Sequence, residues 1–194
     1  MQGEAWARFG RGWPLNAFRC CWRMGGQAVG QRLRDKLHSW DELGLGSCIP
    51  NALAMYLVEY PFVCPDVLGG GEYQHFRTDQ ECLDQELMVR YVQASALMPM
   101  MQFSDAPWRV LPPEHNALCL AAAKLHVTYG ELIKQLAHHA ATSGEPLRHH
   151  LAWAYPGHGY EHIADQFLVG EKLLVAPVTV KGQRERTVPI SPGT

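Results

Sequence analysis

The sequence predicts an α/β fold that is followed by the start of an all-β module, and three observations support this. Up to about residue 155, short apolar strand-like segments alternate with helix-like segments. Residues 60–64, "YPFVC", form a continuous apolar run, which is typical of parallel strands buried on both faces. Residues 165–180 contain two apolar runs around Gly170–Glu171, which is a hairpin pattern. This order of elements favours a parallel α/β sheet or barrel with β-structure after it.

Local patterns predict each element in turn. In the segment 47–59, Leu53 and Leu57 lie four residues apart on one helical face, and Pro50 comes early, where a helix tolerates it. Helices are predicted over 47–59, 80–95, 114–126 and 128–142. Strands are predicted at 60–64, 97–103, 146–155, in the hairpin of 165–180, and at 187–190. The first 34 residues are rich in Arg, Gly and Trp and have weak periodicity, so no element is predicted there.

Composition limits the class of protein. The chain has 194 residues, 47% hydrophobic and 19% charged, which is enough for a domain with a sizeable core. The net charge of −2 does not favour nucleic acid or an anionic membrane as a partner. The first ten residues do not form a signal peptide. No apolar stretch reaches the roughly 18 residues of a spanning helix, so no membrane segment is expected in this chain.

Cysteine and histidine spacing does not predict a metal centre. The six cysteines form no Cys-x-x-Cys pair, and Cys20 and Cys21 are adjacent. A structural zinc site needs ligands paired at short spacing. His158 and His162 form His-x3-His, but no cysteine pair precedes them. The histidines are interpreted as surface or satisfied core residues, and we expect no cofactor.

Two aspartates are candidates for chemistry. Asp66 directly follows the strand predicted at 60–64, and three glycines come soon after it. In a (β/α)8 barrel, functional groups lie where strands end, but a carboxylate at such a position is also a common turn residue. Sugar hydrolysis usually needs two carboxyl groups, one of which acts as a general acid. Asp35 lies between Arg34 and Lys36, and by itself this context also fits an exposed charge.

Four segments, taken in order, resemble glycoside hydrolase family 31, and within it the myogenesis-regulating glycosidase branch. The two most specific are "YPFVCPDVLGGG" and "DQFLVGEKLLVAPVTVKGQRERTVPISPGT"; the others are "RCCWRMGGQAVGQRLRDKLHSWDELGLGSCIPNAL" and "ELMVRYVQASALMPMMQFSDAPWRV". The resemblance runs from about residue 5 to 194. It implies the C-terminal half of a (β/α)8 TIM barrel over residues 1–164 and the start of a β-sandwich over 165–194.

The resemblance also implies roles for particular residues. Asp35 matches the acid/base aspartate of retaining exo-glycosidases, which act mostly on α-glucosides, and the branch is associated with α-galactosides. Arg19 matches an arginine of the sugar-binding site, Asp66 an aspartate near the −1 subsite, and Trp108 an aromatic residue of the pocket region. The implied partner is a carbohydrate substrate. For the longer protein, the resemblance suggests the secretory pathway or its membranes.

The chain departs from the family pattern at several positions. Arg34 stands where the family usually has glycine before the acid/base aspartate, and Cys20–Cys21 replaces small residues. After "GEP", the family pattern continues with Arg-Pro, whereas here Arg148 is followed by two histidines. The family nucleophile is an aspartate well upstream of the acid/base residue, and Glu4 is the sole acid before Asp35. We therefore expect this chain to begin after the nucleophile.

Three functions remain open from the sequence. The chain is part of an active family 31 glycosidase, a non-catalytic glycosidase-like protein that binds a sugar or a partner, or a structural fragment. A retaining double displacement does not run without its second carboxylate, so the isolated chain is expected to be inactive. Half a barrel has open strand edges, so we also expect the isolated chain to fold poorly or to self-associate.

Overall fold

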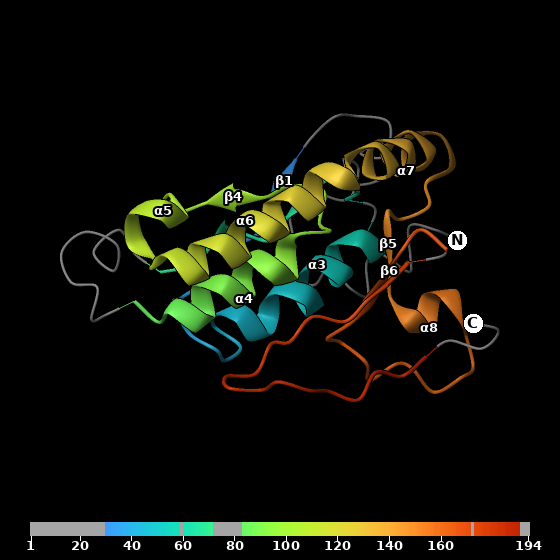
Figure 1. Cartoon of the computed structure of the whole chain (residues 1–194). Coiled ribbons are helices and arrows are strands. Elements are labelled where there is room, and N and C mark those ends of the chain that lie inside the picture. The colour runs from blue at the N-terminus through green and yellow to red at the C-terminus, as the bar shows by residue number, and fades with distance from the viewer. Residues whose placement is uncertain (1–29, 59, 72–82, 172, 191–194) are drawn as a thin grey trace.

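The computed structural model describes residues 30–58, 60–71, 83–171 and 173–190 (Figure 1). Its elements, in chain order, are β1 (Gln31–Arg32), the 3-10 helix η1 (Leu45–Ser47), α3 (Cys48–Leu57), β2 (Val63–Cys64), β3 (Val67–Leu68), α4 (Gln85–Ser95), β4 (Gln102–Phe103), α5 (Pro107–Val110), α6 (Pro113–Thr128), α7 (Gly130–Ser143), β5 (Arg148–His149), α8 (Leu151–Ala154), β6 (Phe167–Val169) and β7 (Leu173–Val175).

The first part of the chain alternates strands with helices, as the sequence predicts. β1 pairs with β2 in parallel, and α3 connects them; β3 pairs with β4 in parallel, and α4 connects them. Only Pro65 and Asp66 separate β2 from β3, so one extended segment takes part in both pairs. The prediction of parallel α/β structure is therefore confirmed, although the strands are shorter than expected. β1 was not predicted, because its two residues are polar and carry no apolar pattern.

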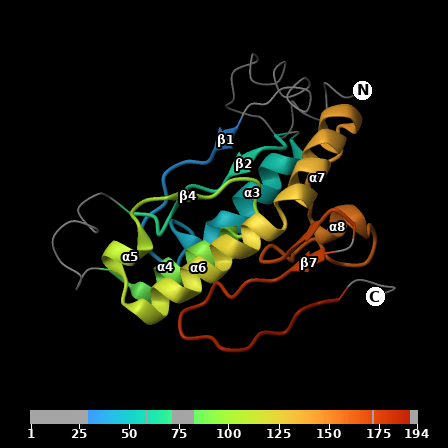
Figure 2. The ribbon, with the colours of Figure 1, turned by 45° about the horizontal axis from the view of Figure 1, so that its top comes forward.

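Four predicted helices are confirmed with small changes at their ends. α4 begins after Asp84, whose carboxylate accepts the N–H of Leu87, and α6 has Pro113 in its first turn, where the missing N–H is harmless. α7 ends at Gly144, which has φ 80° in the left-handed region that glycine adopts readily. α5 lies at one end of the molecule, and α7 and α8 lie at the other (Figures 1 and 2).

The last part of the chain forms an antiparallel sheet in the order β5-β6-β7. β6 and β7 form the hairpin predicted around Gly170–Glu171, with Leu168 opposite Leu174. The strand predicted over 146–155 is largely wrong, since only residues 148–149 are extended and α8 follows at once. The side chain of His150 accepts the N–H of Ala152, which caps this short helix. No strand forms at 187–190, where one was also predicted.

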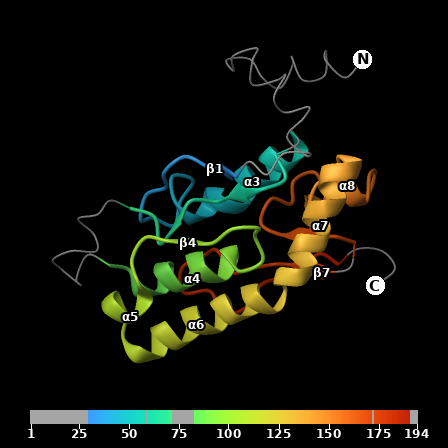
Figure 3. The ribbon, with the colours of Figure 1, turned by 90° about the horizontal axis from the view of Figure 1, so that it is seen from above.

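A shared core joins the two parts. Tyr56 and Leu53 of α3 pack in the same buried cluster as Phe167 and Val169 of β6. Arg148 is also buried beside this cluster, and its guanidinium donates to the carbonyl oxygens of Leu97 and Leu147. A buried arginine without such acceptors would be strongly destabilising, so these bonds fix β5 to the chain that follows α4. A second cluster packs α4 against α6, and the two helices lie side by side (Figure 3).

Candidate active site

Two of the predicted site residues follow adjacent parallel strands. Arg32 of β1 is opposite Cys64 of β2 in the register of the pair. Asp35 comes three residues after Arg32, and Asp66 comes two residues after Cys64. Because the strands are parallel, their carboxyl ends meet at one edge of the sheet. The fold therefore places both carboxylates at the edge where α/β proteins usually carry functional groups.

Arg32 joins the two carboxylates. Its Nη1 lies 2.5 Å from Oδ1 of Asp35, and its Nη2 lies 2.5 Å from Oδ1 of Asp66. The pKa of Arg32 is raised, chiefly by the hydrogen bond to Asp35 and further by the charge of Asp66. The side chain of Asp35 is 86% exposed, whereas that of Asp66 is 1% exposed. One carboxylate of the group is thus open to a ligand and the other is enclosed by the protein.

Asp66 differs from an ordinary turn carboxylate. Its φ is 124°, a value that a residue with a side chain rarely adopts. Its Oδ2 accepts the backbone N–H of Lys36 at 2.6 Å. Such strained conformations persist only where the surroundings hold them, and they occur preferentially at functional sites. Within the described part of the chain, Asp66 thus holds both Arg32 and the loop that carries Asp35.

That loop, residues 35–44, lies against the glycines that follow Asp66. Gly71 donates its N–H to the carbonyl of Lys36, and the Tyr91 hydroxyl donates to the carbonyl of Leu37. A Cβ on Gly70 would lie 2.5 Å from the Leu37 carbonyl oxygen, and Gly70 has φ 60°. Glycine is therefore required at position 70 for two reasons, a left-handed backbone and the close approach of another chain segment.

His38 and Trp40 tie the same loop to the start of α4. The N–H of Asp84 donates to Nε2 of His38 at 2.9 Å, and Nδ1 of His38 lies 2.6 Å from the carbonyl oxygen of Gly69. Because an N–H only donates and a carbonyl only accepts, the proton of neutral His38 is on Nδ1. Nε1 of Trp40 donates to Oδ2 of Asp84 at 3.0 Å. The loop is thus held by both the strand ends and a helix terminus.

Lys36 contributes an unusual buried amine. Its side chain is almost fully buried, and its Nζ has no hydrogen-bond partner among the described residues. Burial lowers the pKa of Lys36, because removal from water disfavours the charged form. The nearby thiol of Cys48 is also buried, which raises its pKa to about 12. The Cys48 thiol also lies 3.9 Å from the carbonyl oxygen of Gly44, at the end of the loop that carries Asp35.

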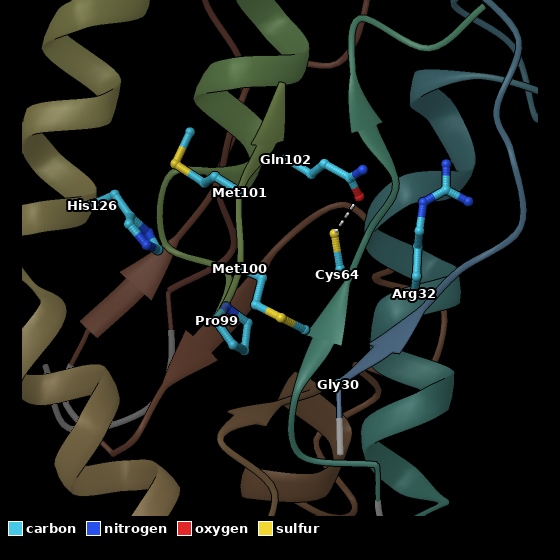
Figure 4. Close-up of a pocket in the computed structure, with 8 residues that line it drawn as sticks. All are labelled: Gly30, Arg32, Cys64, Pro99, Met100, Met101, Gln102 and His126. Atoms are coloured by element: carbon cyan, nitrogen blue, oxygen red, sulfur yellow. Dashed lines mark hydrogen bonds between the residues drawn. The ribbon is translucent and has the colours of Figure 1, made fainter. Parts of the chain in front are cut away.

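A pocket of about 480 Å³ lies beside this group (Figure 4). Its lining comes from β1, β2, β4, α6 and the segment that leads into β4: Gly30, Arg32, Cys64, Pro99, Met100, Met101, Gln102 and His126. Arg32 is the only one of these side chains that also belongs to the ion-paired group. The rest of the lining is mainly sulfur-containing and apolar, with one amide and one imidazole. Arg32 therefore connects the pocket to the two aspartates.

Trp108, another predicted site residue, does not belong to this group. Trp108 lies on α5, and its side chain is 74% exposed. Arg19 lies outside the described residues. Sequence reasoning did not single out Arg32, Lys36 or His38. The run of alternating basic residues around Asp35 looks like a solvated surface, and only the pairing of β1 with β2 turns Arg32 toward both carboxylates. Among the described residues, no group of three potential metal ligands comes together.

Comparisons with known proteins decide the family. The model of the glycosyl hydrolase family 31 C-terminal domain matches residues 144–194. The myogenesis-regulating glycosidase of Mus musculus is 37% identical over 171 residues, which cover 84% of this chain and 23% of that protein. The chain belongs to glycoside hydrolase family 31. The family 31 assignment thus rests on matches that together run along most of the chain.

Solved family 31 structures share the fold. The glucosidase II alpha subunit, in its Glc1Man2-bound structure, is 25% identical and has a TM-score of 0.64; the match covers 78% of this chain and 16% of that one. The α-xylosidase of Xanthomonas citri has a TM-score of 0.67 at 24% identity, with coverage of 82% and 18%. This chain spans less than a quarter of the length of each of these relatives. No helix in its described part is long and apolar enough to cross a membrane.

Proposed function

We propose that this chain supplies the acid/base side of a retaining α-glycosidase site, with Asp35 as the acid/base residue. The observation that carries the proposal is the Arg32 guanidinium, which joins Asp35 and Asp66 at the carboxyl ends of two parallel strands. Membership of family 31 supports a glycosidase rather than another reaction class. Hydrolysis of an O-glycosyl bond is the function that fits both the geometry and the family.

The geometry supports different roles for Asp35, Asp66 and Arg32. Asp35 is exposed, so a substrate can approach its carboxyl group, which would protonate the leaving oxygen and then deprotonate water. Asp66 is buried and positions Arg32 and the backbone of Lys36. Because the Asp66 side chain is only 1% exposed, a sugar hydroxyl would reach it only if the surrounding chain moved. We therefore infer that Asp66 acts on the sugar mainly through Arg32.

The same proposal extends to the fold and the substrate. Residues 1–164 would form the C-terminal half of a TIM barrel and residues 165–194 the start of a β-sandwich. The two parallel pairs support the first part and the β6–β7 hairpin supports the second. The solved structures compared above are named a glucosidase and a xylosidase, so α-glucosides are the first substrates to assay. The resemblance to the myogenesis-regulating branch keeps α-galactosides among the candidates.

One observation favours a second function, a non-catalytic protein that binds a sugar or a partner. Arg32 donates to Oδ1 of Asp35, so one oxygen of the proposed acid is already engaged by the protein rather than by a substrate. Arg34 adds a long charged side chain directly beside Asp35. The two functions differ in one respect that is simple to test, which is whether a nucleophilic carboxylate belongs to the same polypeptide.

The test begins with the transcript. The reading frame upstream of Met1 is sequenced, and a strand motif containing an aspartate would supply the missing nucleophile. The protein encoded by the whole frame is then assayed with aryl α-glucoside, α-galactoside and α-xyloside. We expect Asp35→Asn to lose most turnover, and azide to restore turnover of activated aryl substrates by replacing water as the attacking group.

The matched control is Glu42→Gln, which removes another exposed carboxylate from the segment that follows Asp35. Its turnover should equal that of the unchanged protein. Full activity of Asp35→Asn would overturn the acid/base assignment. An inactive protein that still binds the sugar, with an unchanged Kd in Asp35→Asn, would favour the non-catalytic function.

A further inference from the structure

The C-terminal turn formed by residues 181–183 docks on the first turns of α4. Nζ of Lys181 lies 2.6 Å from Oδ2 of Asp84. The N–H of Gly182 donates to both carboxylate oxygens of Glu86, at 3.1 and 3.2 Å. Nη2 of Arg90 donates to the carbonyl of Gln183 at 3.1 Å. Three consecutive residues thus contact the N-cap and first two turns of a helix that lies about 90 residues earlier in the chain (Figure 1).

Asp84 connects this turn to the loop that carries Asp35. Its Oδ2 accepts from both Lys181 and Trp40, while its Oδ1 accepts the N–H of Leu87 in α4. Its own N–H donates to His38. A single residue therefore links three segments that are distant in the sequence: loop 35–44, the start of α4, and turn 181–183.

The contacts of Asp84 meet the loop farther along the chain than the contact of Asp66 does. Asp66 binds the backbone N–H of Lys36, next to Asp35, whereas Asp84 binds the side chains of His38 and Trp40 farther along. Gly71 and Tyr91 also hold the backbone of Lys36 and Leu37, so the loop has few conformations left to it. The position of the Asp35 backbone consequently depends on whether the contacts of both Asp66 and Asp84 with the loop are kept.

We propose that turn 181–183 positions the Asp35 loop through Asp84, and that Lys181 is the positioning residue. The functional meaning of this link rests on the proposed acid/base role of Asp35. The link itself rests only on the contacts above. Lys181 holds the Asp84 carboxylate where Trp40 also reaches it, so without the lysine the position of that carboxylate depends on the weaker hold of Trp40 and the Leu87 N–H.

The exposure of the Lys181 side chain sets the expected effect of removing its ion pair with Asp84. The side chain of Lys181 is 63% exposed, and ion pairs at such positions contribute little to global stability. A purely structural pair of this kind would leave the rest of the molecule unchanged when broken. A positioning pair would instead produce a local response at loop 35–44 without a matching loss of stability. The two roles therefore differ in a measurable way.

The experiment measures hydrogen exchange of the full chain by mass spectrometry in Lys181→Met, Lys181→Arg and Lys134→Met. Lys134 is the matched control, because it is 66% exposed and pairs with Glu131 at 3.7 Å on α7. In Lys181→Met we expect exchange of the amides of residues 36–45 to rise about two- to five-fold, with the thermal midpoint nearly unchanged. Lys181→Arg should restore protection, since arginine also pairs with a carboxylate.

Three results would overturn the proposal. One is unchanged exchange over residues 36–45 in Lys181→Met. Another is an equal rise in Lys134→Met, and the last is a rise spread evenly over the whole chain. In a protein with measurable turnover, Lys181→Met should also slow substrates with poor leaving groups more than activated ones. If Asp35 is not the acid/base residue, the dependence of turnover on the leaving group disappears while the exchange result stands. A failure of the proposed acid/base role is thus distinguishable from a failure of the proposed link.

Discussion

At the scale of single residues, the site depends on backbone positions that only particular residues tolerate. Asp66 keeps a φ of 124°, and Gly70 a φ of 60° with the Leu37 carbonyl in the space that a side chain would fill. Both residues shape the surface on which the Asp35 loop rests. Arg32 then uses that surface to contact an exposed carboxylate and a buried one with a single side chain.

The variant Gly70→Ala tests this arrangement. Its Cβ would lie 2.5 Å from the Leu37 oxygen and 2.9 Å from the Tyr91 hydroxyl oxygen. Gly144→Ala is the matched control, because Gly144 has φ 80° but nothing within 4 Å of the added carbon. Both variants carry the strain of a left-handed alanine, so urea unfolding should show that Gly70→Ala is less stable by about a further 1 to 3 kcal/mol. Equal midpoints for the two would show that the loop moves aside freely.

At the scale of elements, α4 is the helix that organises the candidate site. Asp84, the N-cap of α4, binds Trp40 of loop 35–44 and Lys181 of turn 181–183. Tyr91, in the middle of α4, also binds the loop. Its buried face meanwhile packs against α6. One amphipathic helix thus uses its buried face for the core and its N-terminal end for the site.

Asp84 at the start of α4 gives a pH dependence. Burial alone would raise its pKa, but the hydrogen bonds from Lys181, Trp40 and the Leu87 N–H outweigh burial and lower the pKa to about 2. A lowered carboxyl pKa stabilises the fold above the unfolded value of 3.8, and this contribution is lost as pH falls toward 2. Urea unfolding should therefore show that the advantage of the native protein over Asp84→Asn is larger at pH 6 than near pH 2, by about 1 kcal/mol.

Asn is a suitable replacement, because its side-chain oxygen still caps α4. The part of the difference that changes with pH then reports the charge of Asp84, because the amide nitrogen of Asn accepts from neither Trp40 nor Lys181 at any pH. High salt should reduce the difference, since the Lys181 pair is exposed. A difference between native protein and variant that is constant from pH 6 to pH 2 would contradict the assignment.

At the scale of the whole molecule, the parallel strands form two short pairs rather than a closed sheet. In the described ranges, β1 pairs only with β2, and β4 pairs only with β3. The outer edges of such strands present backbone groups that another strand can bind. Phe103 of β4 is also 37% exposed at this edge. We propose that the isolated chain self-associates through these edges.

Sedimentation of the 194-residue chain tests this proposal. We expect species larger than 21.8 kDa, and we expect Phe103→Lys to shift the distribution toward monomer, because a charge on an edge strand opposes pairing. Leu120→Lys is the control, since Leu120 is an exposed apolar residue of α6, away from the strand edges. A monomer with a sharp cooperative melt, or an equal response to both variants, would count against association through the strands.

Much of the fold was predictable because helices and hairpins depend on neighbouring residues. Apolar spacing locates α3, α4, α6 and α7, and paired apolar runs locate the β6–β7 hairpin. The predictions failed where distant contacts overrode local preference. The segment after Arg148 reads as a strand, yet it becomes α8 once Leu151 is buried and His150 caps the helix.

Residue order and spacing alone predict the family, the alternation of helices with parallel strands, and the place of Asp66 two residues after a strand. These features depend on residue order and spacing, which a single chain displays in full. Only the tertiary structure decided that Asp66 is buried, that Arg32 joins it to Asp35, and that Asp84 ties the loop to Lys181. Two of these contacts, Arg32 with Asp66 and Asp84 with Lys181, connect residues more than 30 positions apart. Strand register and helix packing bring such residues together, and no local pattern in the sequence encodes that proximity.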